Sequence, residues 1–123
     1  MNWLPEDAAR ALAKTLNWEP PNHDDYPGSI PDHAWEAWRA FEGIAARSIQ
    51  WRKVDATSWR KAHDADWSPD FEAASEGEHL LLIQHDWHGF PDPPEWALHV
   101  MDGGEKVARC LGCFDTWPET WSS

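Results

Sequence analysis

The chain has 123 residues, of which 41% are hydrophobic, and it carries a formal net charge of −12 at pH 7. This length is typical of one domain, so we predict a single domain over residues 1–123. The negative surface repels nucleic-acid phosphates and anionic lipids, which excludes nucleic acids and membrane surfaces as favoured partners.

Targeting segments are not expected either. The longest apolar run, residues 80–83, is far shorter than the ~18–20 residues that cross a bilayer. Residues 1–16 include charged side chains and no continuous apolar segment, unlike a secretory signal. Because two cysteines are too few for a disulfide scaffold, we expect a cytoplasmic protein.

The N-terminal half predicts two helices. The first covers residues 5–16, where Pro5 suits the first turn and two acidic residues complement the helix N-terminus. Residues 17–30 are rich in proline and predict a loop that exposes Trp18. The apolar face of the first helix is expected to consist of Leu4, Ala8, Leu12 and Leu16.

The second predicted helix begins at Ser29, which forms a capping-box-like pair with Asp32. It extends to Ala46 or beyond. Its apolar stripe consists of Ala34, Trp38, Phe41 and Ala45, with Trp35 on the flank.

Residues 47–61 leave two alternatives open. Residues 49–51 alternate in polarity as a strand would, whereas Thr57 or Ser58 could cap a short helix through Ala62. A single helical turn is then predicted over residues 68–72, with Ser68 as its cap.

The C-terminal half predicts strands. An Asp-Gly-Gly-Glu turn at residues 102–105 joins two of them into a hairpin. The predicted strands cover residues 79–85, 96–101 and 106–111.

The tail is expected to dock on the domain, because residues 114–123 contain Trp117 and Trp121. The predicted fold class is therefore α+β. Two N-terminal helices, plus one or two short ones, pack on a small C-terminal antiparallel sheet of about three strands.

The distribution of charge is the strongest functional signal. Between Ala62 and Glu105 the chain has eleven carboxylates and no lysine or arginine. Such a stretch either maintains solubility or projects a field that attracts a basic macromolecule. We favour the second reading. The charged candidates for a partner-binding surface are Asp64, Asp66, Asp70, Glu72, Glu76, Glu78, Asp86, Asp92 and Glu95.

Five of the ten basic residues lie within residues 47–61. They form either an internal counter-surface for the acidic half or a second polar contact site, and both alternatives stay open.

The chain also has eleven tryptophans, more than a domain with few other large apolar residues should bury. Trp35, Trp38, Trp51 and Trp96 occupy core-like positions and are expected to pack. Trp18, Trp67 and Trp87 lie in predicted loops, where exposed aromatic rings suit a contact surface or carbohydrate stacking. We predict Trp67, Trp87 and Phe90 as apolar anchors of the partner surface.

Cys110 and Cys113 have the spacing of metal ligands, and with His85 and His88 they could supply four ligands for tetrahedral zinc. Against this, residues three apart in a strand point to opposite faces, although Gly112 could allow a tight turn. A thioredoxin-like redox pair is not favoured, because no helix clearly begins at Cys110. We predict no cofactor and keep a zinc-stabilised binding module as an alternative.

Catalytic motifs lack support. His-Asp pairs at residues 63–66 and 85–86 suggest metal-dependent phosphohydrolases, but such short matches arise by chance in a chain with seven histidines. Neither a phosphate-binding glycine loop nor a G-x-S-x-G motif is present. We therefore do not predict an enzyme.

These features together predict a small acidic inhibitor that binds and neutralises a basic, nucleic-acid-processing enzyme. Such enzymes have positive clefts for phosphate, which a protein rich in carboxylates can occupy. The class that fits best is a bacterial immunity protein against a nuclease-type toxin. The nearest alternative is a phage-encoded DNA mimic that acts, like an anti-CRISPR protein, against a defence complex.

Overall fold

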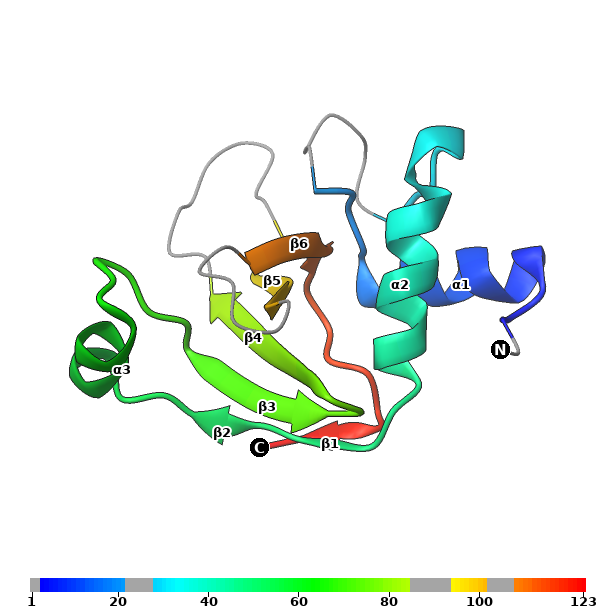
Figure 1. The fold of residues 1–123 in the computed structure, drawn as a ribbon. Helices are drawn as coiled ribbons and strands as arrows, with labels where there is room; N and C mark the ends of the chain where they lie inside the picture. Colours follow the sequence, from blue (N-terminus) through cyan, green and yellow to red (C-terminus); the bar gives the residue numbers. More distant parts are fainter. Residues whose placement is uncertain (1–2, 22–27, 85–93, 102–107) are drawn as a thin grey trace.

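The structure, a computed structural model, describes residues 3–21, 28–84, 94–101 and 108–123 (Figure 1). In these ranges the chain is a mixed α+β protein whose five-stranded antiparallel sheet has the order β2-β3-β4-β5-β6. Among the helices of these ranges, none combines the length and the apolar character that crossing a bilayer requires. The elements are α1 (Glu6–Leu16), a 3-10 helix η1 (Asp32–Ala34), α2 (Trp35–Ala45), β1 (Ile49–Gln50), β2 (Arg52–Lys53), α3 (Ala56–His63), β3 (Phe71–Ser75), β4 (Glu78–Gln84), β5 (Trp96–Met101), β6 (Ala108–Phe114) and β7 (Trp121–Ser122).

The α+β class is confirmed, but the sheet is larger than the predicted three strands. The helical turn predicted over residues 68–72 is wrong, since Phe71 begins β3 and pairs with Leu82 of β4. The hydrogen bonds that β4 offers to this segment outweigh a local serine cap signal. β2 adds a further strand at the edge through the pairing of Arg52 with Glu72.

Helix α1 confirms the predicted helix to within one residue, but its buried face differs from the prediction. The buried residues are Ala9, Ala13 and Leu16, whereas Leu4 and Ala8 are exposed and Leu12 is only half-buried. The two small alanines allow the α1 backbone to approach the core closely, which larger side chains on that face would prevent.

Helix α2 confirms the predicted apolar stripe, because Ala34, Trp38, Phe41 and Ala45 are all buried. The predicted start at Ser29 is wrong. Pro31 is extended, with ψ at 158°, so the chain becomes helical only at Asp32 and passes through η1 before α2.

Both alternatives for residues 47–61 occur in succession, as strands β1 and β2 and then helix α3. The cap of α3 is Asp55 rather than Thr57 or Ser58. The Asp55 carboxylate accepts a hydrogen bond from the backbone N–H of Ser58 at 2.9 Å, as an N-cap residue does.

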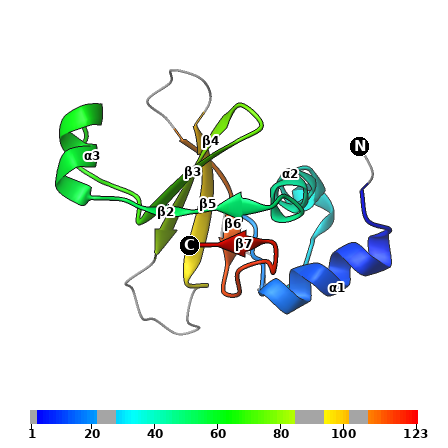
Figure 2. The same cartoon turned by 90° about the horizontal axis from the view of Figure 1, so that it is seen from below.

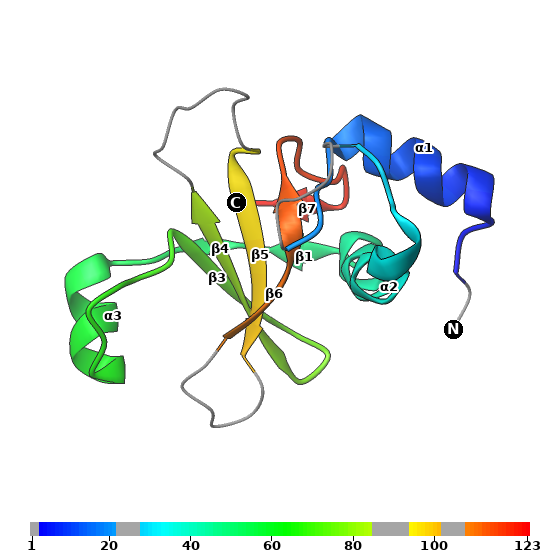
Figure 3. The same ribbon diagram turned by 90° about the horizontal axis from the view of Figure 1, so that it is seen from above.

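The predicted docking of the tail is confirmed. Strand β7 pairs in parallel with β1, close to the end of α2 (Figures 2 and 3). The Trp121 Nε1–H donates to the carbonyl of Ile44 at 3.2 Å, and the Thr120 hydroxyl donates to Ala45. These bonds hold the tail against α2.

An aromatic cluster fills the space between the sheet and the first two helices, which lie on one side of it (Figure 2). The prediction that Trp18 is exposed is wrong: this ring is fully buried and lies edge-on to Trp38 at 5.2 Å. Trp18 directly follows the left-handed cap residue of α1, which turns the chain back towards the core. The predicted packing of Trp38 and Trp51 is confirmed, and Trp35 and Trp96 are half-buried against the same cluster.

Strand β6, described from Ala108, ends later than predicted, and it contains a bulge. Gly112 pairs with Leu98 and Cys110 pairs with His99, so Leu111 is an extra residue without a partner on β5. The turn predicted at residues 102–105 lies outside the described residues.

Candidate functional site

One end of the five-stranded sheet carries carboxylates from three different segments. Asp70 precedes β3, Glu95 precedes β5 and Asp115 follows β6. Because the strands are antiparallel, the starts of β3 and β5 lie beside the end of β6, at the end towards which β4 points (Figure 1). We call Asp70, Glu95 and Asp115 the acidic end.

Hydrogen bonds fix these carboxylates in place. The Gln84 backbone N–H donates to Asp70 Oδ2 at 2.7 Å, and the Gln84 side-chain amide donates to Glu95 Oε1 at 2.7 Å. The Glu95 N–H donates to Asp115 Oδ1 at 2.7 Å, and the Asn17 amide donates to Asp115 Oδ2. All three carboxylates are exposed, and no ion pair within residues 3–21, 28–84, 94–101 and 108–123 involves them. Their negative charge is therefore held in position and available to a partner.

Two further predicted contact residues lie in the segment that leads from α3 to β3. Asp64 is the left-handed cap residue of α3, with φ at 50°, and Asp66 is two residues beyond it; both are exposed. Trp67 is half-buried, and its ring centroid lies 6.3 Å from that of Trp59. Packing therefore occupies part of the Trp67 ring that was predicted as an anchor.

Glu72 lies in β3, beside the edge strand β2, and forms an ion pair with Arg52 of that strand. The His79 Nε2 lies 3.4 Å from the second Glu72 oxygen. Burial raises the pKa of Glu72, but the hydrogen bond and the charge of Arg52, together with His79, outweigh it and leave the pKa below its usual value. Glu72 is therefore engaged within the chain.

Glu76 and Glu78 are engaged in the same way by a single arginine. Arg47 Nε lies 3.1 Å from Glu76, and Arg47 Nη2 lies 2.8 Å from Glu78. Two residues of the basic segment 47–61, Arg47 and Arg52, thus act as a counter-surface for the acidic stretch.

Four of the predicted contact residues lie outside the described residues: Asp86, Trp87, Phe90 and Asp92. The same holds for the zinc-ligand candidates His85 and His88. Asp115 was not predicted, because it lies beyond the acidic stretch in the sequence and only the antiparallel sheet brings it to Glu95.

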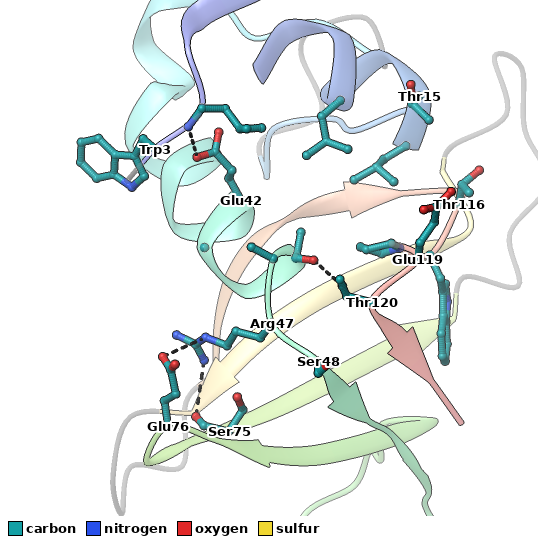
Figure 4. Close-up of a pocket in the computed structure, with 18 residues that line it drawn as sticks. Trp3, Thr15, Glu42, Arg47, Ser48, Ser75, Glu76, Thr116, Glu119 and Thr120 are labelled. Atoms are coloured by element: carbon teal, nitrogen blue, oxygen red, sulfur yellow. Dashed lines mark hydrogen bonds and ion pairs between the residues drawn. The ribbon is translucent and has the colours of Figure 1, made fainter. Parts of the chain in front are cut away.

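A groove of about 1020 Å³ lies between α1, α2, the turn after β3 and residues 116–120 (Figure 4). Two of the charged groups that line it, Glu42 and Arg47, are already engaged within the chain. Glu42 is buried and accepts from the Trp38 indole, the Arg39 guanidinium and the backbone N–H of Leu4, and Arg47 pairs with Glu76 at the rim. Nothing in the groove marks a reacting group. Local sequence patterns do not predict the groove, because segments distant in the chain form it.

Cys110 and Cys113 lie together on the sheet face that also carries His99. The Gly112 N–H donates to Cys110 Sγ at 3.4 Å. The Cys113 thiol donates to the Cys110 sulfur, and this bond, with help from His99 and Gly112, lowers the pKa of Cys110 against the opposing effect of burial. The pKa of Cys113 is raised by the same hydrogen bond and by burial.

The described ranges contain no group of three or more His, Cys, Asp or Glu side chains arranged to hold a metal ion. The Nδ1 of His99 is buried and has no hydrogen-bond partner. Within the described residues, the two sulfurs and this ring form a thiol pair with an adjacent imidazole.

Comparison of the chain with protein-family models, with curated proteins and with solved structures finds no match.

Proposed function

We propose that this protein is an acidic inhibitor that binds a basic, nucleic-acid-processing enzyme through the acidic end of its sheet. The class we favour is an immunity protein against a nuclease-type toxin, and the protein binds rather than catalyses. It acts in the cytoplasm, a compartment that suits a chain whose two cysteines are both free thiols.

One observation carries the proposal: Asp70, Glu95 and Asp115 are exposed, are held by hydrogen bonds and are not compensated by a cation within the described residues. Carboxylates that are already oriented lose little side-chain entropy on binding. They also attract a positive cleft from a distance, which speeds association. Asp64 and Asp66 extend the same charge towards α3.

Three other predicted contact residues contribute less in this proposal. Glu72, Glu76 and Glu78 are paired with Arg52 and Arg47 inside the chain. A partner would have to displace those arginines before it could use these carboxylates. The contact surface we propose is therefore narrower than the acidic stretch of the sequence.

The experiment is affinity capture from extracts of the native host, with three forms of the protein. The first is the wild type. The second neutralises the acidic end by Asp70→Asn, Glu95→Gln and Asp115→Asn, changes that keep an oxygen to accept the bond at residues 70 and 95 and one of the two bonds at residue 115. The third is a control of equal net charge, with the exposed acids of α1, η1 and α2 changed by Asp7→Asn, Asp32→Asn and Glu36→Gln.

We expect the wild type and the control to retain a basic protein that cleaves nucleic acid, and the acidic-end variant to lose it. Adding the wild-type chain should inhibit the nuclease activity of the eluted protein. Equal retention by all three forms would contradict the site, and unaltered nuclease activity would contradict the function.

The alternative function is that of a phage-encoded DNA mimic. Such a protein uses the same electrostatic attraction to bind a nucleic-acid-guided defence complex. Capture of a guide-bound defence complex in place of a nuclease toxin would favour this alternative.

A further inference from the structure

The bulge in β6 has a consequence for the two cysteines. In a regular strand, residues three apart point to opposite faces. Here the extra residue Leu111 shifts the alternation by one position, so Cys110 pairs with His99 and Cys113 pairs with Ala97. Since His99 and Ala97 are two residues apart on β5, their partners share one face of the sheet.

Contacts with the buried Trp18 ring stabilise the bulge. Gly112 has φ at 125°, and a Cβ there would lie 2.3 Å from Trp18 Nε1. That Nε1–H donates to the Leu111 carbonyl at 3.2 Å. The buried Trp18 ring therefore holds the backbone in the conformation that brings the sulfurs together.

The two thiols differ in the way that a reactive pair requires. Cys110 is half-buried and its sulfur accepts hydrogen bonds from Gly112 and Cys113, which favour the thiolate. Cys113 is 1% exposed and stays protonated. Cys110 is thus placed to attack a reagent from solvent, and Cys113 is placed to attack Cys110 afterwards.

We propose that Cys110 and Cys113 form a reversible dithiol–disulfide site, whose substrates are small or protein disulfides. A bridge between residues 110 and 113 closes a very short loop, which gains little chain entropy compared with a long one. A disulfide at this position would therefore stabilise the fold only slightly. Reversible oxidation, in contrast, needs only the contact between the two sulfurs.

The reaction proceeds in two steps. The Cys110 thiolate attacks one sulfur of the substrate disulfide, a Cys110–S–S–R bond forms, and the first thiolate leaves and takes a proton from water. The Cys113 sulfur then attacks the Cys110 sulfur, and its proton departs with the second thiol. The protein loses two hydrogens as it is oxidised, and the substrate disulfide gains them as two thiols.

The test uses the full chain, equilibrated in glutathione buffers of increasing oxidised-to-reduced ratio. Samples are quenched in acid, alkylated and measured by intact mass. We expect one transition in which both thiols become unreactive together and the mass falls by two hydrogens, with full reversal by dithiothreitol.

Two variants assign the order of attack. Cys113→Ser should accumulate a glutathione adduct on Cys110, because the second step is removed. Cys110→Ser should form an adduct at least about tenfold more slowly, because a buried, protonated thiol is a poor nucleophile. Circular dichroism checks that both variants are folded, and the wild-type titration needs no variant.

Three results would overturn the proposal. The first is a wild-type chain that keeps two alkylatable thiols at every glutathione ratio. The second is oxidation that joins two chains instead of closing within one. The third is stoichiometric zinc in the purified protein that blocks alkylation and that Cys110→Ser releases, since the thiols would then be metal ligands.

Discussion

The two faces of the five-stranded sheet consist of alternate residues of the same strands, yet they differ in character. On the face towards α1 and α2, Leu80, Leu82 and Leu98 are fully buried in the aromatic cluster. The opposite face mixes buried apolar residues with four half-buried titratable groups: Glu72, His79, His99 and Cys110. One face therefore carries the apolar core, and the other carries the titratable groups.

The largest expected effect is on the apolar face. Trp38→Ala removes a fully buried ring that contacts Trp18 and Phe41, so we expect the free energy of unfolding to fall by about 3–5 kcal/mol. Denaturant titration measures this change. Trp3→Ala is the control, since Trp3 is 54% exposed and should cost less than about 1 kcal/mol. Equal costs would contradict the packing described for Trp38.

The next effect concerns the bulge in β6, which shifts by one residue the alternation of side chains between the two faces. Gly112→Ala combines a strained φ with a clash against Trp18, so we expect a loss of about 2–4 kcal/mol. Gly43→Ala is the matched control, because a Cβ at Gly43 in α2 meets nothing within 4 Å. That change should raise stability by about 0.5–1 kcal/mol, as Gly to Ala does inside a helix. A neutral Gly112→Ala in the same denaturant titration would mean that Trp18 does not hold the bulge.

A smaller effect is expected from the ion pair on the polar face. Because the pKa of Glu72 is lowered by folding, its contribution to stability is present above the pKa of the unfolded chain and is lost as pH falls through the folded value. Glu72→Gln should cost less than about 1 kcal/mol at pH 7, since the Arg52 partner is largely exposed and solvent screens the pair.

Glu72→Gln should also flatten the decline of stability with falling pH below the usual carboxylate range, measured by denaturant titration at several pH values. Glu36→Gln is the control, since no ion pair within the described residues involves Glu36. A slope that responds equally to both changes would contradict the role given to Glu72.

The last effect concerns the reactivity of Cys110. Alkylation of an ordinary thiol speeds up about 80-fold between pH 6 and pH 8, and the unfolded chain should follow that profile. The alkylation rate of Cys110 in the folded protein should change far less over the same pH range. The reason is that the hydrogen bond from Cys113, and to a smaller extent His99, lowers the pKa of Cys110. Cys113→Ala should restore more of the pH dependence than His99→Gln, and His33→Gln should restore none. Identical profiles for folded and unfolded chains would be the contrary result.

Much of the fold follows from local patterns in the sequence. Strand β5 has the predicted bounds, and the α2 stripe is correct, because alternation and helical spacing report directly on burial. Strand β3 was missed because its Ala-Ala-Ser sequence has weak strand propensity and depends on pairing with β4.

The candidate sites depend more on contacts between distant residues. The bulge at Leu111 cannot be read from Cys-Leu-Gly-Cys alone, since Trp18, over 90 residues away, fixes it. Spacing suggested that Cys110 and Cys113 diverge, and only the shifted register unites them. Likewise, the acidic stretch predicted Asp70 and Glu95 but not Asp115. The counter-surface of residues 47–61 was one of two open alternatives, and only the fold shows that Arg47 pairs with Glu76 and Glu78.

The central claim is that the acidic end steers a basic partner, and the association rate constant of the captured partner tests it most directly. Measured by stopped flow at several salt concentrations, the wild type should bind about tenfold or more faster at low salt than the Asp70→Asn, Glu95→Gln, Asp115→Asn variant. The rate constants of the wild type and of the equal-charge control should also depend more steeply on salt than that of the acidic-end variant. Identical rate constants and salt dependence for wild type and acidic-end variant would contradict the claim.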